Sequence, residues 1–369
     1  MAKSKLTGLA LALSMAPFPA LAAPVVAPNV PTVSPEGHHY LSQPLTSQIY
    51  TADPSAHVFN GKIYVYPSHD VPTAIPDDDL GSEYAMHDYR VLEMDHVGAP
   101  VTVGAVALDV KDVPWASKQM WAPDAAYKNG TYFLYFPVRD KSKDKHGLGT
   151  FRIGVATSKS PMGPFKAEPA PIKLAYSMDP AVFTDTDGKS YLYFGGIWGG
   201  QLQRWATGKF DPNGSDTDLG QDDKPALSGK VALMTPDMKQ LAEPPRDAVI
   251  LDAAGKPVLG GDHEKRFFEA SWMFKKDGKY YYTYSTGDTH FLNYALGTNP
   301  YGPFTYTGHI LLPVQGWTTH HSILKADGKW WLFYADTQIS NKNHLRNVKV
   351  TELHFNADGT IQTVNPFVD

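Results

Sequence analysis

The chain of 369 residues contains no cysteine, and this absence removes several kinds of chemistry. Without thiols there is no cysteine nucleophile, no cysteine-ligated zinc and no disulfide, so stability must come from the packed core. Runs of basic residues are also missing, and the formal net charge is −5. A nucleic-acid partner is therefore not expected, because such a partner requires a basic surface.

Apolar runs long enough to span a membrane are missing as well. A short apolar run, Leu6–Ser14, follows two lysines and precedes the small-x-small sequence ALA. This pattern predicts a cleavable signal peptide at residues 1–22 and therefore a secreted or periplasmic protein without a membrane partner. Its removal takes away two lysines and leaves a formal charge of about −7. The proline-rich residues 23–36 are predicted to form a flexible leader, and no oligomeric state is predicted.

The chain does contain one motif five times: a turn with glycine, followed by a short aromatic strand. The copies are FNGKIYVYPSHD from Phe59, KNGTYFLYFPV from Lys128, TDGKSYLYFGG from Thr186, KDGKYYYTYST from Lys276 and ADGKWWLFYAD from Ala326. Asn-Gly and Asp-Gly favour two-residue hairpin turns, so each copy is predicted to be a hairpin tip that leads into a strand. Aromatic residues on both faces are typical of sheets that are covered on both sides.

A second repeated segment supports this organisation. ATSKSPMGPF at 156–165 and ALGTNPYGPF at 295–304 are interpreted as the same later hairpin in two units. Units of roughly 50–90 residues, each a small antiparallel sheet stacked on its neighbours, are typical of β-propellers. We therefore predict an all-β fold, a five-bladed β-propeller, over residues 37–369. A β-sandwich with glycine-rich turns is the alternative, although sandwiches seldom repeat a turn and strand so regularly.

A polar residue precedes each turn glycine at a similar distance along the chain. These residues are Asp53 (eight before Gly61), Asp124 (six before Gly130), Asp179 (nine before Gly188), Glu269 (nine before Gly278) and His320-His321 (eight and seven before Gly328). Equivalent strand positions of a propeller point to one axis, so these side chains are expected to meet in one cavity. An Asp before proline can also simply begin a turn, and Asp124 is interpreted as structural because its offset differs. Clustered acids raise one another's pKa, a cost that turns alone do not require.

Carboxylates that meet in a water-filled pocket either bind a hard cation or carry out acid–base hydrolysis. Hydrolysis of a glycosidic bond needs a protonated acid at the leaving oxygen and an ionised partner. Glu269 suits the acid, because three neighbouring aromatic residues could desolvate it and raise its pKa. Asp53 has polar neighbours and suits the ionised base, and Asp179 could orient Glu269 and raise its pKa.

Tryptophans in loop-like contexts are candidates for stacking on sugar faces. They are Trp115, Trp121, Trp198 and Trp317. We predict substrate contacts for Trp121 and Trp198, while burial in the core is the alternative for each of the four.

At these stretches the chain resembles glycoside hydrolase family 43, the five-bladed propeller β-xylosidases and α-L-arabinofuranosidases. The matching stretches are TADPSAHVFNGKIYVYPSHD, QMWAPDAAYKNGTYFLYF, YSMDPAVFTDTDGKSYLYFGG, FFEASWMFKKDGKYYYTYST, THHSILKADGKWWLFYAD and LRNVKVTELHFNADGTI. They cover almost all of the predicted mature chain.

The resemblance implies an inverting exo-glycoside hydrolase that releases xylose from xylo-oligosaccharides, arabinofuranosyl side chains from hemicellulose, or both. It implies Asp53 as general base, Glu269 as general acid and Asp179 as the residue that modulates the pKa of the acid and orients it. It also implies that His320 helps to hold a largely water-coordinated ion, usually Ca²⁺, on the axis. Arg346 matches a family arginine that reaches the sugar, with a surface strand position as the alternative.

Other functions would need other features. An endo-arabinanase would need an open cleft instead of a pocket. A non-catalytic sugar-binding propeller would repeat its site in every blade, whereas the axial residues here differ between the blades. A retaining five-bladed fructosidase is disfavoured because no NDPNG-type segment is present.

Overall fold

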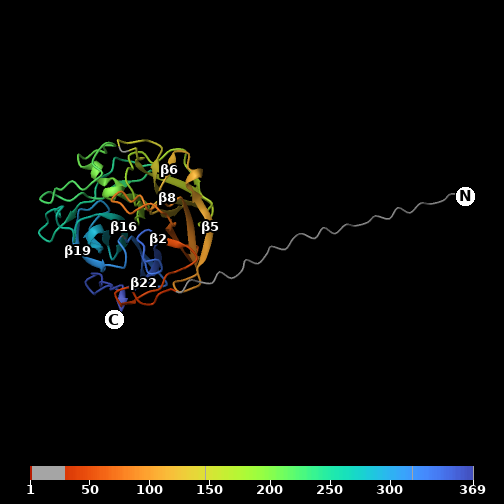
Figure 1. Ribbon diagram of the computed structural model, residues 1–369. Helices are drawn as coiled ribbons and strands as arrows, with labels where there is room; N and C mark the ends of the chain where they lie inside the picture. Colours follow the sequence, from red (N-terminus) through yellow and green to blue (C-terminus); the bar gives the residue numbers. More distant parts are fainter. Residues whose placement is uncertain (2–29, 146, 318, 369) are drawn as a thin grey trace.

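In the computed structural model, small antiparallel sheets surround a central axis (Figure 1). The structure describes residue 1 and residues 30–145, 147–317 and 319–368. The predicted signal peptide and the first half of the predicted leader lie outside the described residues, so both stay predictions. Within the described part of the chain, regular structure consists of strands and 3-10 turns, and no helix is long and apolar enough to cross a membrane.

Five sheets of three to five strands form the blades, which confirms the predicted all-β, five-bladed propeller. Blade 1 contains β2 (Tyr50–Phe59), β3 (Lys62–Asp70), β4 (Asp88–Met94) and β5 (Thr102–Asp109). Blade 2 contains β6 (Ala116–Lys118), β7 (Asp124–Lys128), β8 (Thr131–Asp140), β9 (Phe151–Ser158) and β10 (Lys166–Ala167). Blade 3 contains β11 (Ala181–Thr184), β12 (Ser190–Phe194), β13 (Lys230–Leu233) and β14 (Arg246–Asp247). In Figure 1, β2 lies near the centre and β5 at the rim.

The chain continues into two further blades and a small sheet that joins its ends. Blade 4 contains β16 (Glu269–Lys276), β17 (Lys279–Ser285), β18 (Leu292–Gly297) and β19 (Phe304–Leu311), with β15 (Ile250–Leu251) parallel to β19. Blade 5 contains β20 (His321–Ala326), β21 (Lys329–Asp336) and β22 (Asn347–Leu353). The end strands β1 (His39–Tyr40) and β23 (Phe367–Val368) pair antiparallel. The 3-10 turns are η1 (Val110–Asp112), η2 (Trp198–Gly200), η3 (Leu202–Trp205) and η4 (Gly287–Thr289).

The five predicted turns lie at the tips of the hairpins formed by the two innermost strands of each blade. In four of them both central residues have positive φ, as at Asn60 (52°) and Gly61 (76°), which is the type I′ geometry of a two-residue hairpin. The third turn differs from the expectation. Residues 185–189 join β11 to β12, and the N–H of Gly188 donates to the carbonyl of Asp185 (2.9 Å). This loop is longer because its aspartates close a local turn before the glycine.

Hydrogen bonds between innermost strands connect neighbouring blades around the axis. Asp124 of blade 2 accepts from the backbone N–H of Val182 in blade 3 (2.5 Å), and Asp179 accepts from the N–H of Ala270 in blade 4 (2.9 Å). Between blades 4 and 5, Trp272 Nε1 donates to the carbonyl of Ile323 (3.2 Å). Between blades 1 and 5, the N–H of Ala56 donates to Ser322 Oγ (3.0 Å). Between blades 1 and 2, Asp124 contacts Ser55 and His57. Most of these partners are buried, where an unmade hydrogen bond is costly, so the ring fixes the inner strands.

The N-terminal segment closes the ring against blade 5. The N–H of Leu45 donates to the carbonyl of Val348 in β22 (2.8 Å), and the N–H of Thr51 donates to the carbonyl of Arg346 (2.8 Å). The segment therefore covers the edge of a blade that has only three strands. Blade 5 also contains an ion pair between Lys349 and Asp336, whose side chains are 0% and 1% exposed.

Apolar side chains fill the space between adjacent blades. In β17 every residue after Lys279 is buried, including four tyrosines, which confirms that this aromatic strand is covered on both faces. Its neighbours β16 and β18 are mostly buried as well. Packing on both faces leaves the inner strands little freedom, and this rigidity positions the side chains at the axis.

Candidate active site

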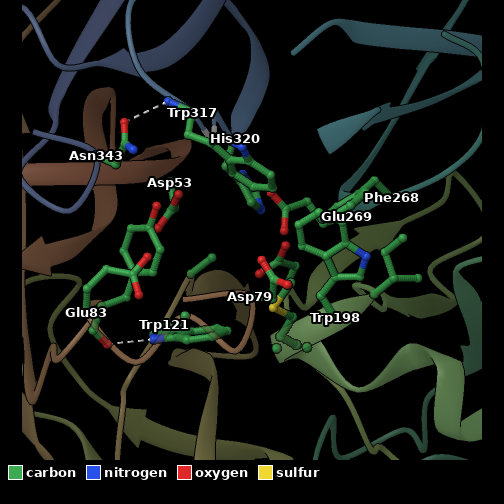
Figure 2. Close-up of a pocket in the computed structure, with 18 of the residues that line it drawn as sticks. Asp53, Asp79, Glu83, Trp121, Trp198, Phe268, Glu269, Trp317, His320 and Asn343 are labelled. Carbon is green, nitrogen blue, oxygen red and sulfur yellow. Dashed lines mark hydrogen bonds between the residues drawn. The ribbon is translucent and has the colours of Figure 1, made fainter. Parts of the chain in front are cut away.

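A cavity of about 260 Å³ opens on the axis, where the innermost strands begin. All seven residues predicted for the site line it: the acids Asp53, Asp179 and Glu269, then Trp121 and Trp198, and finally His320 and Arg346. Figure 2 shows the carboxyl groups of Asp53 and Glu269 on different sides of the open space. The structure therefore brings the predicted residues together from all five blades.

Other residues considered from the sequence lie outside the cavity lining. Asp124 is fully buried and bonds to neighbouring inner strands, which agrees with its interpretation as structural. His321 is also buried, and its Nε2 lies 2.6 Å from Thr283 Oγ1. Trp115 stacks on an aromatic side chain of blade 2, so for this tryptophan the core alternative holds.

The three acids lie at irregular points of the inner strands. The pairing of β2 with β3 changes register next to Asp53, which has a φ of 49°. The pairing of β16 with β17 changes register next to Glu269, and the following Ala270 has a φ of 64°. Asp179 has a φ of 54°. Positive φ costs a non-glycine residue about 1–3 kcal/mol, and bulges re-aim side chains. Positive φ therefore accompanies each of the three acids, at Asp53 and Asp179 themselves and at the residue that follows Glu269.

Asp53 is held as an acceptor on both carboxylate oxygens. Its Oδ2 accepts from the hydroxyl of Ser68 (2.6 Å) and from Arg346 Nη2 (3.2 Å), while Oδ1 accepts from Arg346 Nη1 (2.8 Å). The residue is only 7% exposed, so these contacts form away from bulk water. All three contacts are donated to Asp53, so together they fix the orientation of its carboxylate.

Arg346 connects Asp53 to a second acid. Its Nε donates to Asp70 Oδ2 (2.9 Å), its Nη2 donates to Asp70 Oδ1 (2.9 Å), and its guanidinium lies 5.0 Å from the ring centre of Tyr84. At 2% exposure it is not a surface arginine. Within the described residues, one of the two Nη1 hydrogens has no acceptor. Since Arg346 lines the cavity, this hydrogen is available to a ligand.

Asp179 lies next to the backbone that carries Glu269. Its Oδ2 accepts from the N–H of Ala270, the residue that follows the glutamate. Burial raises the pKa of Asp179 well above its usual value, and the charges of Glu269 and Asp53 raise it further. Glu269 itself is half-buried and begins β16. The arrangement places a carboxyl group that favours its protonated form beside the glutamate.

Aromatic side chains form two walls of the cavity. Trp198 packs against Phe268 and Trp317, with ring centres 5.2 and 5.7 Å away. Trp121 is mostly buried, and its Nε1 donates to the carbonyl of Tyr84 (2.9 Å), so only part of its ring faces the space. Flat apolar surfaces of this kind suit the carbon faces of a sugar ring.

His320 lines the cavity, and its buried Nε2 has no hydrogen-bond partner among the described residues. Its Nδ1 accepts from the backbone N–H of His321 (2.7 Å) and lies 3.1 Å from the carbonyl oxygen of the same residue. Burial lowers the pKa of His320, which favours the neutral ring that can bind a metal ion. Among the described residues, no group of three or more histidine, aspartate or glutamate side chains could hold a metal.

The loop between β3 and β4 contributes to the site, but this contribution was not predicted from the sequence. This loop brings Asp77, Asp78, Asp79, Glu83 and Tyr84 to the cavity. The acidic run PDDDLGSEY was the available signal, but the loop has no counterpart in the repeat. Asn343 and Trp317 also line the cavity, and Asn343 Oδ1 accepts from the N–H of Trp317 (3.1 Å). Asp70 was missed because its role depends on Arg346, which is distant in sequence.

Comparison with known proteins shows which family the chain belongs to. The sequence profile described as Glycosyl hydrolases family 43 matches residues 100–361. The chain is 55% identical over 331 residues to Xylosidase/arabinosidase 43A of Humicola insolens, which covers 88% of this chain and 99% of the relative. It is 49% identical over 320 residues to Beta-xylosidase of Xylanibacter ruminicola, which covers 85% of this chain and 97% of the relative.

A solved structure agrees with these matches. It is a GH43 beta-xylosidase/alpha-arabinofuranosidase from a compost microbial metagenome, in complex with xylotriose and in a calcium-free form. The two structures superpose with a TM-score of 0.86 at 58% sequence identity, and the match covers 89% of this chain and 98% of the other. Sequence and fold therefore agree over nearly the whole length of the relatives, and the chain is a glycoside hydrolase that belongs to family 43.

Proposed function

We propose that the protein is an inverting exo-glycoside hydrolase that releases xylose from xylo-oligosaccharides, arabinofuranosyl groups from hemicellulose side chains, or both. The observation that carries this proposal is the axial cavity in which Asp53 and Glu269 meet between aromatic walls. The names of the relatives and the xylotriose in the similar structure support the class of substrate. Relatives that match over nearly their full length are xylosidases and arabinosidases, which favours this activity over an endo-arabinanase.

Asp53 is the general base of this mechanism. Its carboxylate is held in place by Ser68 and Arg346, and it accepts a proton from a water molecule as that water attacks the anomeric carbon. Attack from the face opposite to the leaving group inverts the configuration of that carbon. The free hydrogen on Arg346 Nη1 can donate to a sugar hydroxyl, and Trp121 and Trp198 can pack on the sugar ring.

Glu269 is the general acid. It protonates the oxygen of the leaving group as the glycosidic bond breaks. Phe268, the preceding residue, is buried in the aromatic wall and keeps an apolar surface beside the acid. Asp179 is the positioning partner, because it holds the N–H of Ala270 and adds a carboxyl group beside Glu269. A non-catalytic propeller would not require three acids in one cavity, each beside strained backbone.

The first prediction concerns the stereochemistry of the product. Purified protein is expected to hydrolyse nitrophenyl β-xyloside or nitrophenyl α-arabinofuranoside, and from xylotriose it is expected to release xylose from one end. Because water attacks directly, the first xylose formed from a β-linked substrate should be the α-anomer. Proton NMR of the earliest product, before mutarotation, measures this. Retained configuration would contradict the assignment of Asp53 as a base, and cleavage within longer arabinan chains would favour the endo-arabinanase.

Calcium is proposed as a bound cofactor with His320 as its protein ligand. The buried Nε2, which has no partner among the described residues, fits this role. To bind the ion, Nε2 must be the unprotonated nitrogen, so Nδ1 would carry the ring proton and turn from the backbone N–H of His321, from which it accepts, to the carbonyl of the same residue. Because no cluster of protein ligands surrounds this nitrogen in the described part of the chain, water would supply the other ligands. A bound cation supplies positive charge that stabilises nearby ionised carboxylates.

The second prediction follows from this single protein ligand. Exhaustive chelation is expected to lower kcat/KM, and added Ca²⁺ should restore it. The variant His320→Ala should lose the response to Ca²⁺, and titration calorimetry should detect Ca²⁺ binding to the chelated wild type but not to this variant. His321→Ala is the matched control, since His321 lies outside the cavity lining. A wild type whose rate and calorimetric signal ignore both chelator and Ca²⁺ would rule out the cofactor.

A further inference from the structure

We infer that Asp70 is a positioning residue for the general base, because it fixes the arginine that orients Asp53. Asp70 ends β3, and its side chain is 0% exposed. It is not among the residues that line the cavity, and its hydrogen bonds connect it to Asp53 through Arg346. The inference rests on the proposed function, in which Asp53 activates the attacking water.

Asp70 receives three hydrogen bonds from one residue. The backbone N–H of Arg346 donates to Oδ2 (2.8 Å), and so does Nε (2.9 Å), while Nη2 donates to Oδ1 (2.9 Å). This bidentate contact fixes the plane of the guanidinium, and the backbone contact fixes where the side chain starts. The remaining edge of the guanidinium then faces Asp53, which accepts from Nη1 and Nη2. The orientation of the base is therefore set before any substrate binds.

The charges in this network also affect the base. One guanidinium serves two carboxylates, so Asp70 takes part of the stabilisation that Arg346 could give to Asp53. Without the charge of Asp70, Arg346 would hold Asp53 more strongly as an anion and make it a weaker base. The titratable and charged groups around Asp53 are Asp70, Tyr89, Asp179, His320 and Arg346. Of these, Asp70 and Arg346 share a direct ion pair.

Stability alone does not explain such a network. A buried ion pair contributes little compared with apolar packing of the same volume, although the removal of one partner is costly. A second buried pair, Lys349 with Asp336, lies in blade 5 and is not part of the cavity lining. Asp336 is therefore a matched control for Asp70: both are buried aspartates with a buried cationic partner, but only Asp70 reaches the base through that partner.

The test compares Asp70→Asn with Asp336→Asn in the full chain. Asp70→Asn removes the negative charge and sets an amide group against the donors of Arg346. The expected result is a fall of about tenfold or more in kcat with little change in KM, because misplaced catalytic groups lower the rate of the chemical step. The acidic limb of the kcat/KM profile should move to lower pH, since the site loses a neighbouring anion. Asp336→Asn should lose thermal stability, but the acidic limb of its kcat/KM profile and its kcat should stay as in the wild type.

Two further measurements keep the inference open to refutation. Asp70→Glu retains the charge but displaces it, so it is expected to keep the acidic limb and lower kcat several-fold; wild-type kcat in this variant would overturn the positioning role. NMR titration of ¹³C-labelled aspartate, with Asp53 assigned through Asp53→Asn, reads the pKa of the base without any turnover. An unchanged pKa of Asp53 in Asp70→Asn would overturn the inference, whether or not the wild type hydrolyses either glycoside. Failure of the wild type to hydrolyse both glycosides would contradict only the proposed function.

Discussion

Asp53→Ala is expected to abolish hydrolysis of both xylobiose and a dinitrophenyl xyloside, with kcat/KM lower by about 10²–10⁴-fold or more. Every turnover needs a water molecule that loses its proton, whichever leaving group departs. Asp53 is the carboxylate that accepts three hydrogen bonds, from Ser68 and Arg346. Asp179 cannot take over this role, because burial and neighbouring charges raise its pKa and favour its protonated form.

The control for this variant is Asp187→Ala, which changes an exposed aspartate on a turn of blade 3. It should leave kcat/KM unchanged on both substrates. Circular dichroism and thermal unfolding show whether Asp53→Ala still folds, a necessary check because the change leaves Arg346 with Asp70 as its remaining acidic partner. A folded Asp53→Ala that hydrolyses the activated substrate at the wild-type rate would exclude Asp53 as the base.

The propeller could be predicted because its signals are local. An Asn-Gly or Asp-Gly pair favours a tight hairpin wherever it occurs, and aromatic strands need cover on both faces. Five such copies therefore gave the number of blades. The third turn was predicted less well, since Asp185 closes a longer loop there through its own backbone. Loop length depends on small energy differences that a dipeptide motif does not contain.

The acids of the site could be predicted because the repeat placed them at equivalent positions. The strained backbone at these acids could not be predicted from the sequence. Asp53 and Asp179 have positive φ although neither is a glycine, and the surrounding hydrogen bonds maintain this conformation. Asp70 could not be assigned either. Its contacts to Arg346 join residues 276 positions apart, and such pairs are set by how the ring of blades closes. Sequence periodicity describes each blade separately and does not report contacts between the first blade and the last.

The two carboxyl groups that we propose as base and acid differ in their surroundings more than in their chemistry. Asp53 faces hydrogen-bond donors and the cationic guanidinium of Arg346. Glu269 stands beside the buried Phe268 and close to Asp179, whose pKa is raised by burial and by the charge of Glu269. Pairs of titratable groups whose environments push their pKa values apart are typical of acid–base sites. The assignment of Asp53 as base therefore rests on the donors around it, and that of Glu269 as acid rests on its aromatic neighbour and on the nearby buried Asp179.

This difference predicts that Glu269→Ala depends strongly on the leaving group. Xylobiose has a poor leaving alcohol that needs a proton, so kcat/KM on xylobiose should fall by about 10²–10⁴-fold. A dinitrophenolate leaves without protonation, so on the dinitrophenyl xyloside the loss should be much smaller, about tenfold or less. The basic limb of the pH profile should also disappear on the activated substrate, because that limb reports the acid. If Glu269→Ala instead loses both substrates equally while Asp53→Ala spares the activated one, the acid and the base have to be exchanged.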